Sequence, residues 1–169
     1  MFNIRGSDVE FNPVVVAYAV VTTTEAHLFV DPSKLSSPVR AHLEEAAVTL
    51  HGYDEIDAYL ATLISQGRAI LCDPSQLNWR LHGLLGSAAR DGTSPITLPK
   101  ALKHPAELAG IRASHVRDGV ALTAFIHFLE VKIRGDPQGQ YTEYDVTEDL
   151  EIFRQKMALH RGPSFRYVC

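Results

Sequence analysis

Cysteine is scarce in this sequence of 169 residues, which contains only Cys72 and Cys169. Two cysteines do not suffice for the disulfide framework of a small secreted domain, so we expect reduced thiols in a reducing compartment. Cys72 stands in the apolar run AILC, which is typical of a thiol buried in a core. Cys169 is the last residue of the sequence, and we expect its side chain to be mobile.

Basic clusters and long apolar runs are missing as well. Lysine and arginine together number 16 against 20 aspartate and glutamate residues, which gives a net charge of −4, and this charge pattern does not favour a nucleic acid as partner. No apolar run approaches the ~20 residues that a membrane-spanning helix needs. The first residues, MFNIRGSDVEF, lack the basic and apolar regions of a signal peptide. We therefore expect a cytoplasmic protein that binds neither nucleic acid nor membrane.

Motifs for metal binding and nucleophilic catalysis are not found. The sequence has no HExxH, CxxC or GxSxG pattern. His104 and His115 would lie about 16 Å apart along one helix, which is too far for two ligands of one metal ion. We interpret the eight histidines as structural or surface residues, and we predict no catalytic residue, no metal ligand and no cofactor in this chain.

The composition, with 46% hydrophobic and 21% charged residues, is that of one ordinary globular domain or of one domain and part of another. Residues 14–22, VVVAYAVVT, predict a strand buried on both faces, because β-branched residues nearly fill it. The turn TTTEA and a second strand over residues 27–31 complete a predicted hairpin.

Strand and helix patterns then alternate along the chain. Ser37 and Asp54 are the expected N-caps of two helices, and Pro38 occupies the first helical position of the earlier one. The remaining predicted elements are strands over residues 48–53 and 69–74 and a helix over residues 75–88. This alternation predicts an α/β fold with a mixed, partly parallel sheet and flanking helices.

The pattern changes near Thr93, where we place a domain boundary. Residues 1–93 contain most of an α/β domain. Residues 94–169 contain helices without a sheet for them to cover. The first segment of this second part, residues 94–103, is predicted to be short and extended.

Two helices are predicted in the second part. Pro105 begins a long helix, and Thr142 caps a last helix over residues 143–160. We interpret the motif HVRDG, residues 115–119, as packing the long helix against its own domain rather than as an acid–base group. The long helix carries an apolar stripe at helical spacing, formed by Leu108, Ile111, Leu122, Ile126 and Leu129.

Three collinear segments resemble one enzyme family. They are FNIRGSDVEFNPVVVAYAVV, SPITLPKALKHPAELAGIRASHVRDGVAL and YTEYDV with LEIFR after it. Together they are similar to the eukaryotic-type three-domain aminopeptidase P (Xaa-Pro aminopeptidase), a creatinase/prolidase-like metallopeptidase with a pita-bread catalytic domain. The resemblance covers nearly the whole chain, and it depends on the joint order of the segments rather than on any one of them.

The resemblance implies a creatinase-N-like (ribonuclease H-like) mixed sheet in residues 1–93 and the first helices of an incomplete pita-bread domain in residues 94–169. The intact family enzyme removes the N-terminal residue that precedes proline, and two divalent metals, manganese or zinc, activate its water nucleophile. Its metal ligands, two Asp, one His and two Glu, belong to a later segment of the family. We therefore expect that this chain alone does not hydrolyse peptides.

Arg5, Asp8 and Asn12 are the candidate functional residues of the motif RGSDVEFNP. The resemblance places this loop towards the catalytic domain, so these residues could shape a domain junction and the access of substrate. The structural alternative is that Asp8 braces a turn and pairs with Arg5.

The apolar stripe of the long helix needs a cover, because an exposed stripe of that length is prone to aggregation. The cover could be the preceding α/β domain, a second copy of the chain, or a polypeptide that supplies the rest of the enzyme, including a full-length subunit. We predict self-association. Two functional hypotheses follow: a part of an Xaa-Pro aminopeptidase that binds peptide only in the intact enzyme, or a free-standing, non-catalytic interaction and oligomerisation module.

Overall fold

The computed structural model describes residues 2–165 of the chain. Contacts divide the chain into two compact units. The first unit comprises the chain up to Val9 together with Pro13–Leu102, and the second comprises Glu10–Asn12 together with the chain from Lys103 onward. Cys169, whose side chain we expected to be mobile, lies outside the described residues.

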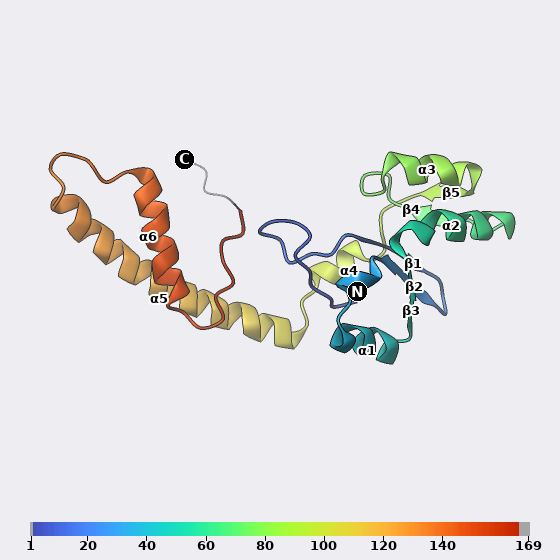
Figure 1. Cartoon of the computed structure of the whole chain (residues 1–169), viewed down its shortest axis with the longest axis horizontal. Coiled ribbons are helices and arrows are strands. Elements are labelled where there is room, and N and C mark those ends of the chain that lie inside the picture. Colours follow the sequence, from blue (N-terminus) through green and yellow to red (C-terminus); the bar gives the residue numbers. More distant parts are fainter. Residues whose placement is uncertain (1, 166–169) are drawn as a thin grey trace. The chain divides into compact units, whose positions relative to one another are not determined.

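A three-stranded sheet with the order β1-β2-β3 forms the centre of the first unit (Figure 1). Strand β1 (Ala17–Val21) pairs antiparallel with β2 (Ala26–Val30). Strand β2 pairs in parallel with β3 (Val48–His51). The predicted hairpin and the predicted mixed sheet are therefore confirmed.

The strand predicted over residues 14–22 differs from β1 in length and in burial. Strand β1 begins only at Ala17 and forms an edge of this sheet, and Val14 and Val21 remain 45% and 52% exposed. The predicted burial on both faces is wrong for β1 and applies to β2, in which every residue from His27 on is buried. Strand propensity did not reveal this, because burial depends on which strands and helices pack on either side.

Helices cover both faces of the sheet (Figure 1). Successive side chains of a strand point to opposite faces, so Phe29 lies in one core cluster while its neighbours in β2 lie in another. Helix α1 (Ser37–Glu45) closes the second cluster with the fully buried Leu43. Helices α2 (Ile56–Ser65) and α3 (Trp79–Leu85) close the cluster around Phe29.

Two of the predicted helix caps are wrong by a small shift. Helix α1 begins one residue earlier than expected, so Ser36 is its N-cap. Asp54 lies within a short 3-10 turn, η2 (Tyr53–Glu55), that precedes α2. The Glu55 carboxylate accepts a hydrogen bond of 3.1 Å from the backbone N–H of Gly52. A glutamate three residues after the cap position satisfies a free N–H in this way.

A second, two-stranded sheet lies in the same unit. Strand β4 (Ile70–Cys72) pairs in parallel with β5 (Ala89–Asp91), and helix α3 and the 3-10 turn η3 (Gly86–Ala88) connect them. The Asn78 side chain caps α3 by accepting a 2.9 Å hydrogen bond from the backbone N–H three residues later. We did not predict β5, because three residues are too few to show a periodic pattern.

Residues 94–103, which we predicted to be extended, contain the short helix α4 (Thr97–Ala101). This segment contains Pro95 and Pro99, and proline disfavours the interior of a helix. Pro99 nevertheless occupies the first turn of α4, where backbone N–H groups have no helical partner and proline is tolerated.

Helices α5 (Pro105–Arg134) and α6 (Glu143–Gln155) make up most of the second unit. His104 caps α5 through Nδ1, which accepts a 3.2 Å hydrogen bond from the backbone N–H of Ala106, and the backbone N–H of His104 donates to Glu107 at 2.9 Å. The predicted starts of both helices are confirmed, but α6 ends at Gln155 rather than near residue 160.

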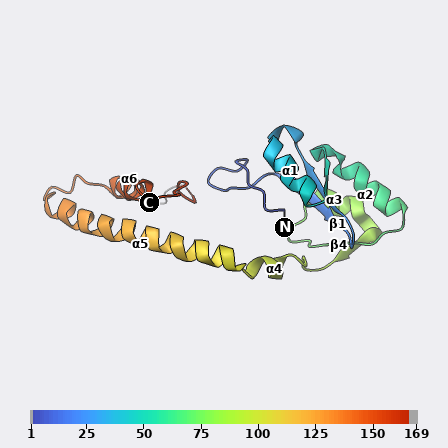
Figure 2. The ribbon, with the colours of Figure 1, turned by 90° about the horizontal axis from the view of Figure 1, so that it is seen from below.

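Aromatic rings hold α5 and α6 together, and α6 lies obliquely against α5 (Figures 1 and 2). Phe125 is buried, and its ring centroid lies 5.8 Å from that of Phe153 on α6. Phe128 lies 5.4 Å from the same ring. Within the described part of the chain, no helix is long and apolar enough to cross a membrane.

Candidate functional site

Asp8 closes the loop that precedes β1. Its Oδ2 atom accepts a 2.7 Å hydrogen bond from the backbone N–H of Val16 and a 2.8 Å hydrogen bond from Lys34 Nζ. Its own backbone N–H donates to the Val14 carbonyl at 3.2 Å. The hydrogen bond from Lys34, followed by that from Val16, lowers the pKa of Asp8 below its usual value of 3.8. The carboxylate therefore joins the loop to the residue just before β1 and to the turn that contains Lys34.

Gly6 allows this loop to lie close to the chain segment that precedes β1. A Cβ atom placed on Gly6 would be 2.8 Å from the Val14 carbonyl oxygen and 3.0 Å from the Val15 Cβ atom. Real Cβ atoms do not approach a backbone oxygen so closely. The close approach of Val14 and Val15 of the same chain therefore explains why the RGSD motif has a glycine at this position.

Arg5 does not form the predicted pair with Asp8, because Lys34 takes that place. The Arg5 guanidinium donates instead to the Ile4 carbonyl at 3.0 Å and to Asn3 Oδ1 at 3.4 Å. Asn12 belongs to the second unit, where its side-chain amide donates to the Glu10 carbonyl at 3.2 Å. The loop is therefore organised locally, and the part that these residues play at a domain junction stays a prediction.

A cluster of Cys72, His82 and Asp91 lies at the end of the two-stranded sheet. His82 Nε2 is 3.1 Å from Asp91 Oδ1, and the Cys72 thiol donates to the same oxygen at 3.7 Å. Burial, and then the nearby Asp91 charge, raise the pKa of the Cys72 thiol above its usual value. Sequence analysis missed this cluster, although the parallel ends of β4 and β5 would have indicated it once β5 was recognised.

A second polar cluster surrounds the buried His27. Its Nδ1 atom lies 3.1 Å from His51 Nε2, and its Nε2 atom lies 3.4 Å from a Glu25 carboxylate oxygen. His51 Nδ1 lies 3.6 Å from Glu55 Oε2. Every ring nitrogen of this pair therefore has a neighbour, and the rings pack against Tyr59. This arrangement fits the predicted role of these histidines as satisfied structural residues.

Asp118 ties α5 to α6. Arg154 Nε donates to one carboxylate oxygen of Asp118 at 2.7 Å, and Nη2 donates to the other at 3.4 Å. Arg154 lowers the pKa of Asp118 below its usual value. Two parallel hydrogen bonds of this kind orient two side chains firmly, and they match the packing role that we inferred for the HVRDG motif.

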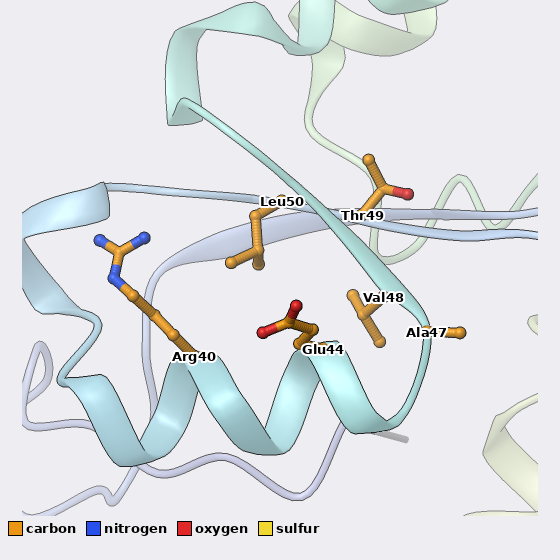
Figure 3. Close-up of a pocket in the computed structure, with 6 residues that line it drawn as sticks. All are labelled: Arg40, Glu44, Ala47, Val48, Thr49 and Leu50. Carbon is orange, nitrogen blue, oxygen red and sulfur yellow. The ribbon is translucent and has the colours of Figure 1, made fainter.

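The described residues line shallow surface depressions, among them the following two. The first, of about 430 Å³, lies between α1 and β3 (Figure 3). Figure 3 shows Arg40 and Glu44 rising from α1 at its rim, but the Arg40 guanidinium is already bonded to the carbonyls of Leu35 and Pro32. The second, of about 610 Å³, is lined by Val116, Gly119, Val120, Thr123, Ala124 and His127 of α5. Neither combines an enclosed space with convergent reactive groups.

Comparison with known proteins identifies the family. The model of the creatinase/prolidase N-terminal domain matches residues 1–107. The chain belongs to the creatinase/prolidase family. Over 98% of its own length, this creatinase/prolidase chain is 38% identical to a probable Xaa-Pro aminopeptidase P of Aspergillus clavatus. Over 92% of its own length, it is 35% identical to Xaa-Pro aminopeptidase 1 of Dictyostelium discoideum. The predicted resemblance to aminopeptidase P is confirmed.

A solved structure carries the same fold. The crystal structure of X-prolyl aminopeptidase from Caenorhabditis elegans, described as a cytosolic enzyme with a di-nuclear active site, matches 97% of the creatinase/prolidase chain with a TM-score of 0.86 and 30% identity. The chain covers 27% of that structure and 26% and 25% of the two curated relatives. The α/β fold class and the pita-bread relationship are confirmed, and the chain spans about a quarter of the length of these relatives.

The side chains described here do not fit a di-nuclear centre of the family type. Such a centre was expected to use two Asp, one His and two Glu. Within residues 2–165, one group of three potential ligands comes within metal-binding distance, and it is Cys72, His82 and Asp91. A thiol among three ligands does not match a cluster of oxygen and nitrogen donors, so no step of peptide hydrolysis is assigned to these residues.

Proposed function

We propose that this chain supplies a structural part of a cytoplasmic Xaa-Pro aminopeptidase. In this proposal residues 1–93 form most of the middle, creatinase-N-like domain, and residues 94–169 begin the catalytic domain. The match of 97% of the chain to an X-prolyl aminopeptidase at a TM-score of 0.86 carries the proposal. The whole enzyme would bind two divalent metals and remove the residue before proline, with its metal ligands outside this segment.

The loop that holds Asp8 would help to shape the access of substrate in the whole enzyme. Its rigidity supports this role, since Asp8 fastens both the backbone at Val16 and the side chain of Lys34. A loop fastened in this way can position a neighbouring domain surface without reacting with the substrate. Arg5 and Asn12, each of which makes local hydrogen bonds within its own unit, would contribute to the same role.

Helix α5 would dock the remainder of the catalytic domain. Its exposed apolar residues include Val116 (68%), Val120 (55%) and Ile126 (52%). The relatives are about four times as long as this chain, so they contain ample polypeptide to cover such a face. Leu108, Ile111 and Leu122 of the predicted stripe are also 38–41% exposed. By helical spacing, Leu122 lies on the same side of α5 as Phe125, which packs against α6, whereas Val116 and Val120 lie on the opposite side. Without that polypeptide we expect a second copy of the chain to cover it.

A segment exchange tests the scaffold role. The corresponding part of the Caenorhabditis elegans X-prolyl aminopeptidase would be replaced by this chain, and cleavage of an Xaa-Pro peptide would be measured with manganese. We expect the chimera to be active and the isolated chain to be inactive. Leu43→Asp in the chimera, which places a charge in a fully buried position, should abolish folding and activity together.

Two variants of the chimera distinguish a kinetic effect of the loop from a general effect on the scaffold. Asp8→Ala should raise KM more than it lowers kcat, while Asp54→Ala, which removes an exposed carboxylate outside the loop, should change neither. Hydrolysis by the isolated chain, with contaminating protease excluded, would overturn the scaffold proposal. A stable, folded chimera without activity would instead favour the non-catalytic module.

A further inference from the structure

Three different elements bring Cys72, His82 and Asp91 together. Cys72 ends β4, Asp91 ends β5, and the two residues are direct partners in the parallel register. His82 projects from α3, the helix that connects the two strands. We propose that these three side chains form a mononuclear site for a thiophilic divalent cation, Zn²⁺.

The distances between the ligand atoms fit one small cation. With Zn–N and Zn–O distances of about 2.0–2.2 Å and a Zn–S distance of about 2.3 Å, tetrahedral ligand atoms lie about 3.3–3.6 Å apart. In this chain the His82 nitrogen and the Asp91 oxygen are 3.1 Å apart, and the Cys72 sulfur is 3.7 Å from that oxygen. All three ligand atoms lie within 4.8 Å of one another. Binding therefore requires the sulfur–nitrogen distance to shorten by at most about 1.2 Å, which rotation of the partly exposed His82 side chain can supply.

The donor set selects the ion. A thiolate and an imidazole favour Zn²⁺ over Mn²⁺ and Mg²⁺, which prefer oxygen ligands. Three protein ligands leave a fourth position open, and the side chains of His82 and Asp91 are 30% and 58% exposed. Water can reach that position from the solvent side.

The backbone around the ligands is well held. Leu81 and Leu85, on either side of His82 along α3, are 1% and 3% exposed and anchor the helix in the core. The backbone N–H of Gly92 donates to the Cys72 carbonyl at 2.9 Å, which joins the ends of the two strands. A site that is organised by rigid elements before binding needs little rearrangement to accept an ion.

Asp73 is not a further ligand, although it follows Cys72 directly. Its Oδ1 atom accepts hydrogen bonds from the backbone and the hydroxyl of Ser75 at 3.0 and 2.6 Å, and Oδ2 accepts from the Ser94 backbone at 3.3 Å. Both oxygens are thus engaged in a turn. Asp73→Asn is therefore a suitable control for loss of a nearby carboxylate.

The only tryptophan of the sequence provides a local reporter. The Trp79 ring lies one helical turn before His82 and stacks on it, with centroids 6.1 Å apart and an interplanar angle of 20°. Trp79 is 87% exposed. A paramagnetic ion held by His82 should therefore quench the fluorescence of Trp79.

Titration of the 169-residue chain with Co²⁺ tests the site, with Cys169→Ser in every protein so that Cys72 is the one remaining thiol. We expect one equivalent of Co²⁺ to give a thiolate-to-metal charge-transfer band and to quench Trp79, and we expect Zn²⁺ but not Mg²⁺ to reverse both signals. Cys72→Ser should remove the band. His82→Gln and Asp91→Asn should weaken binding by at least about tenfold, since even the loss of an outer partner of a ligand costs 10–100-fold.

Three controls keep the test decisive. Asp73→Asn and His51→Gln should bind Co²⁺ as the parent does. The Asp73 carboxylate is engaged in a turn, and the His51 side chain belongs to the separate cluster around His27. Circular dichroism should show that His82→Gln, which changes a partly exposed side chain, keeps the fold. The proposal is overturned if no charge-transfer band forms, if Cys72→Ser retains it, or if His51→Gln abolishes binding while folded His82→Gln does not.

Discussion

Replacement of Gly6 by alanine probes the close contact between the RGSD loop and the chain before β1. The added Cβ atom would lie 2.8 Å from the Val14 carbonyl oxygen, a backbone atom that cannot rotate away. Gly6 is not among the glycines with positive φ, so the expected strain is steric. Overpacking of this kind destabilises the folded state by about 1–3 kcal/mol. Alanine also lowers the conformational entropy of the unfolded chain, which offsets about 0.4–1 kcal/mol of this loss.

We therefore expect Gly6→Ala to lower the free energy of unfolding by about 1–2 kcal/mol and Tm by about 2–8 °C. Gly83→Ala is the matched control in the same unit. Gly83 lies inside α3, and no atom lies within 4 Å of a Cβ placed there. The same chemical change should therefore stabilise the chain by about 0.4–1 kcal/mol at Gly83.

Urea unfolding followed by circular dichroism measures both values, and amide exchange locates the effect. We expect Gly6→Ala to speed exchange of the Val16 amide, which donates to Asp8, and Gly83→Ala to leave it unchanged. Equal free energies of unfolding for the two variants would refute the steric explanation. Unchanged exchange at Val16 would show that the loop accommodates the methyl group without loosening Asp8.

Three further predictions concern the second unit. Arg154 lowers the pKa of Asp118, so this pair stabilises the chain above the unfolded pKa and loses its effect as the pH falls through the lower folded pKa. Asp118→Asn, at a half-exposed pair, should therefore cost no more than about 1 kcal/mol at pH 7 and should flatten the decline of Tm below about pH 4. Burial and then Asp149 raise the pKa of Tyr141 to about 12. The contribution of Tyr141 to the free energy of unfolding should therefore be complete below about pH 10 and should be lost as the pH rises towards 12. In an absorbance titration, the parent should contain one tyrosine that ionises only near pH 12. This late ionisation should be missing from Tyr141→Phe. Light scattering of the isolated chain should give a mass that rises with concentration, and Val120→Glu should reduce it; a monomer at all concentrations would contradict self-association through α5.

Sequence patterns predicted the elements that are long or that carry strong local chemistry. The hairpin from β1 to β2, the helix that follows Asp54, and the start of α5 at Pro105 are where residue types indicated them. These features depend on neighbours within a few residues, such as the capping of α5 by His104 and Glu107. Local signals of this kind are visible without knowledge of the fold.

Features that depend on distant partners were not predicted. Strand β5 has three residues, and only its pairing with β4 makes it a strand. Lys34 takes the place that we expected for Arg5, because the chain between β2 and α1 turns back towards Asp8. The cluster at Cys72 likewise unites residues up to 19 positions apart, and residue spacing alone does not reveal a contact made through a parallel pair of strands.

The order of the strands has a consequence for how the first unit folds during its synthesis on the ribosome. Each strand pairs with the next or the preceding strand along the chain, in the orders β1-β2-β3 and β4-β5. The two parallel pairs are joined through α1 and through α3 with η3, so each connection is local along the chain and closes at a modest entropic cost, which favours folding. Each pairing can therefore form as soon as its second strand leaves the ribosome, and the unit can acquire its sheets before synthesis of α5 is complete.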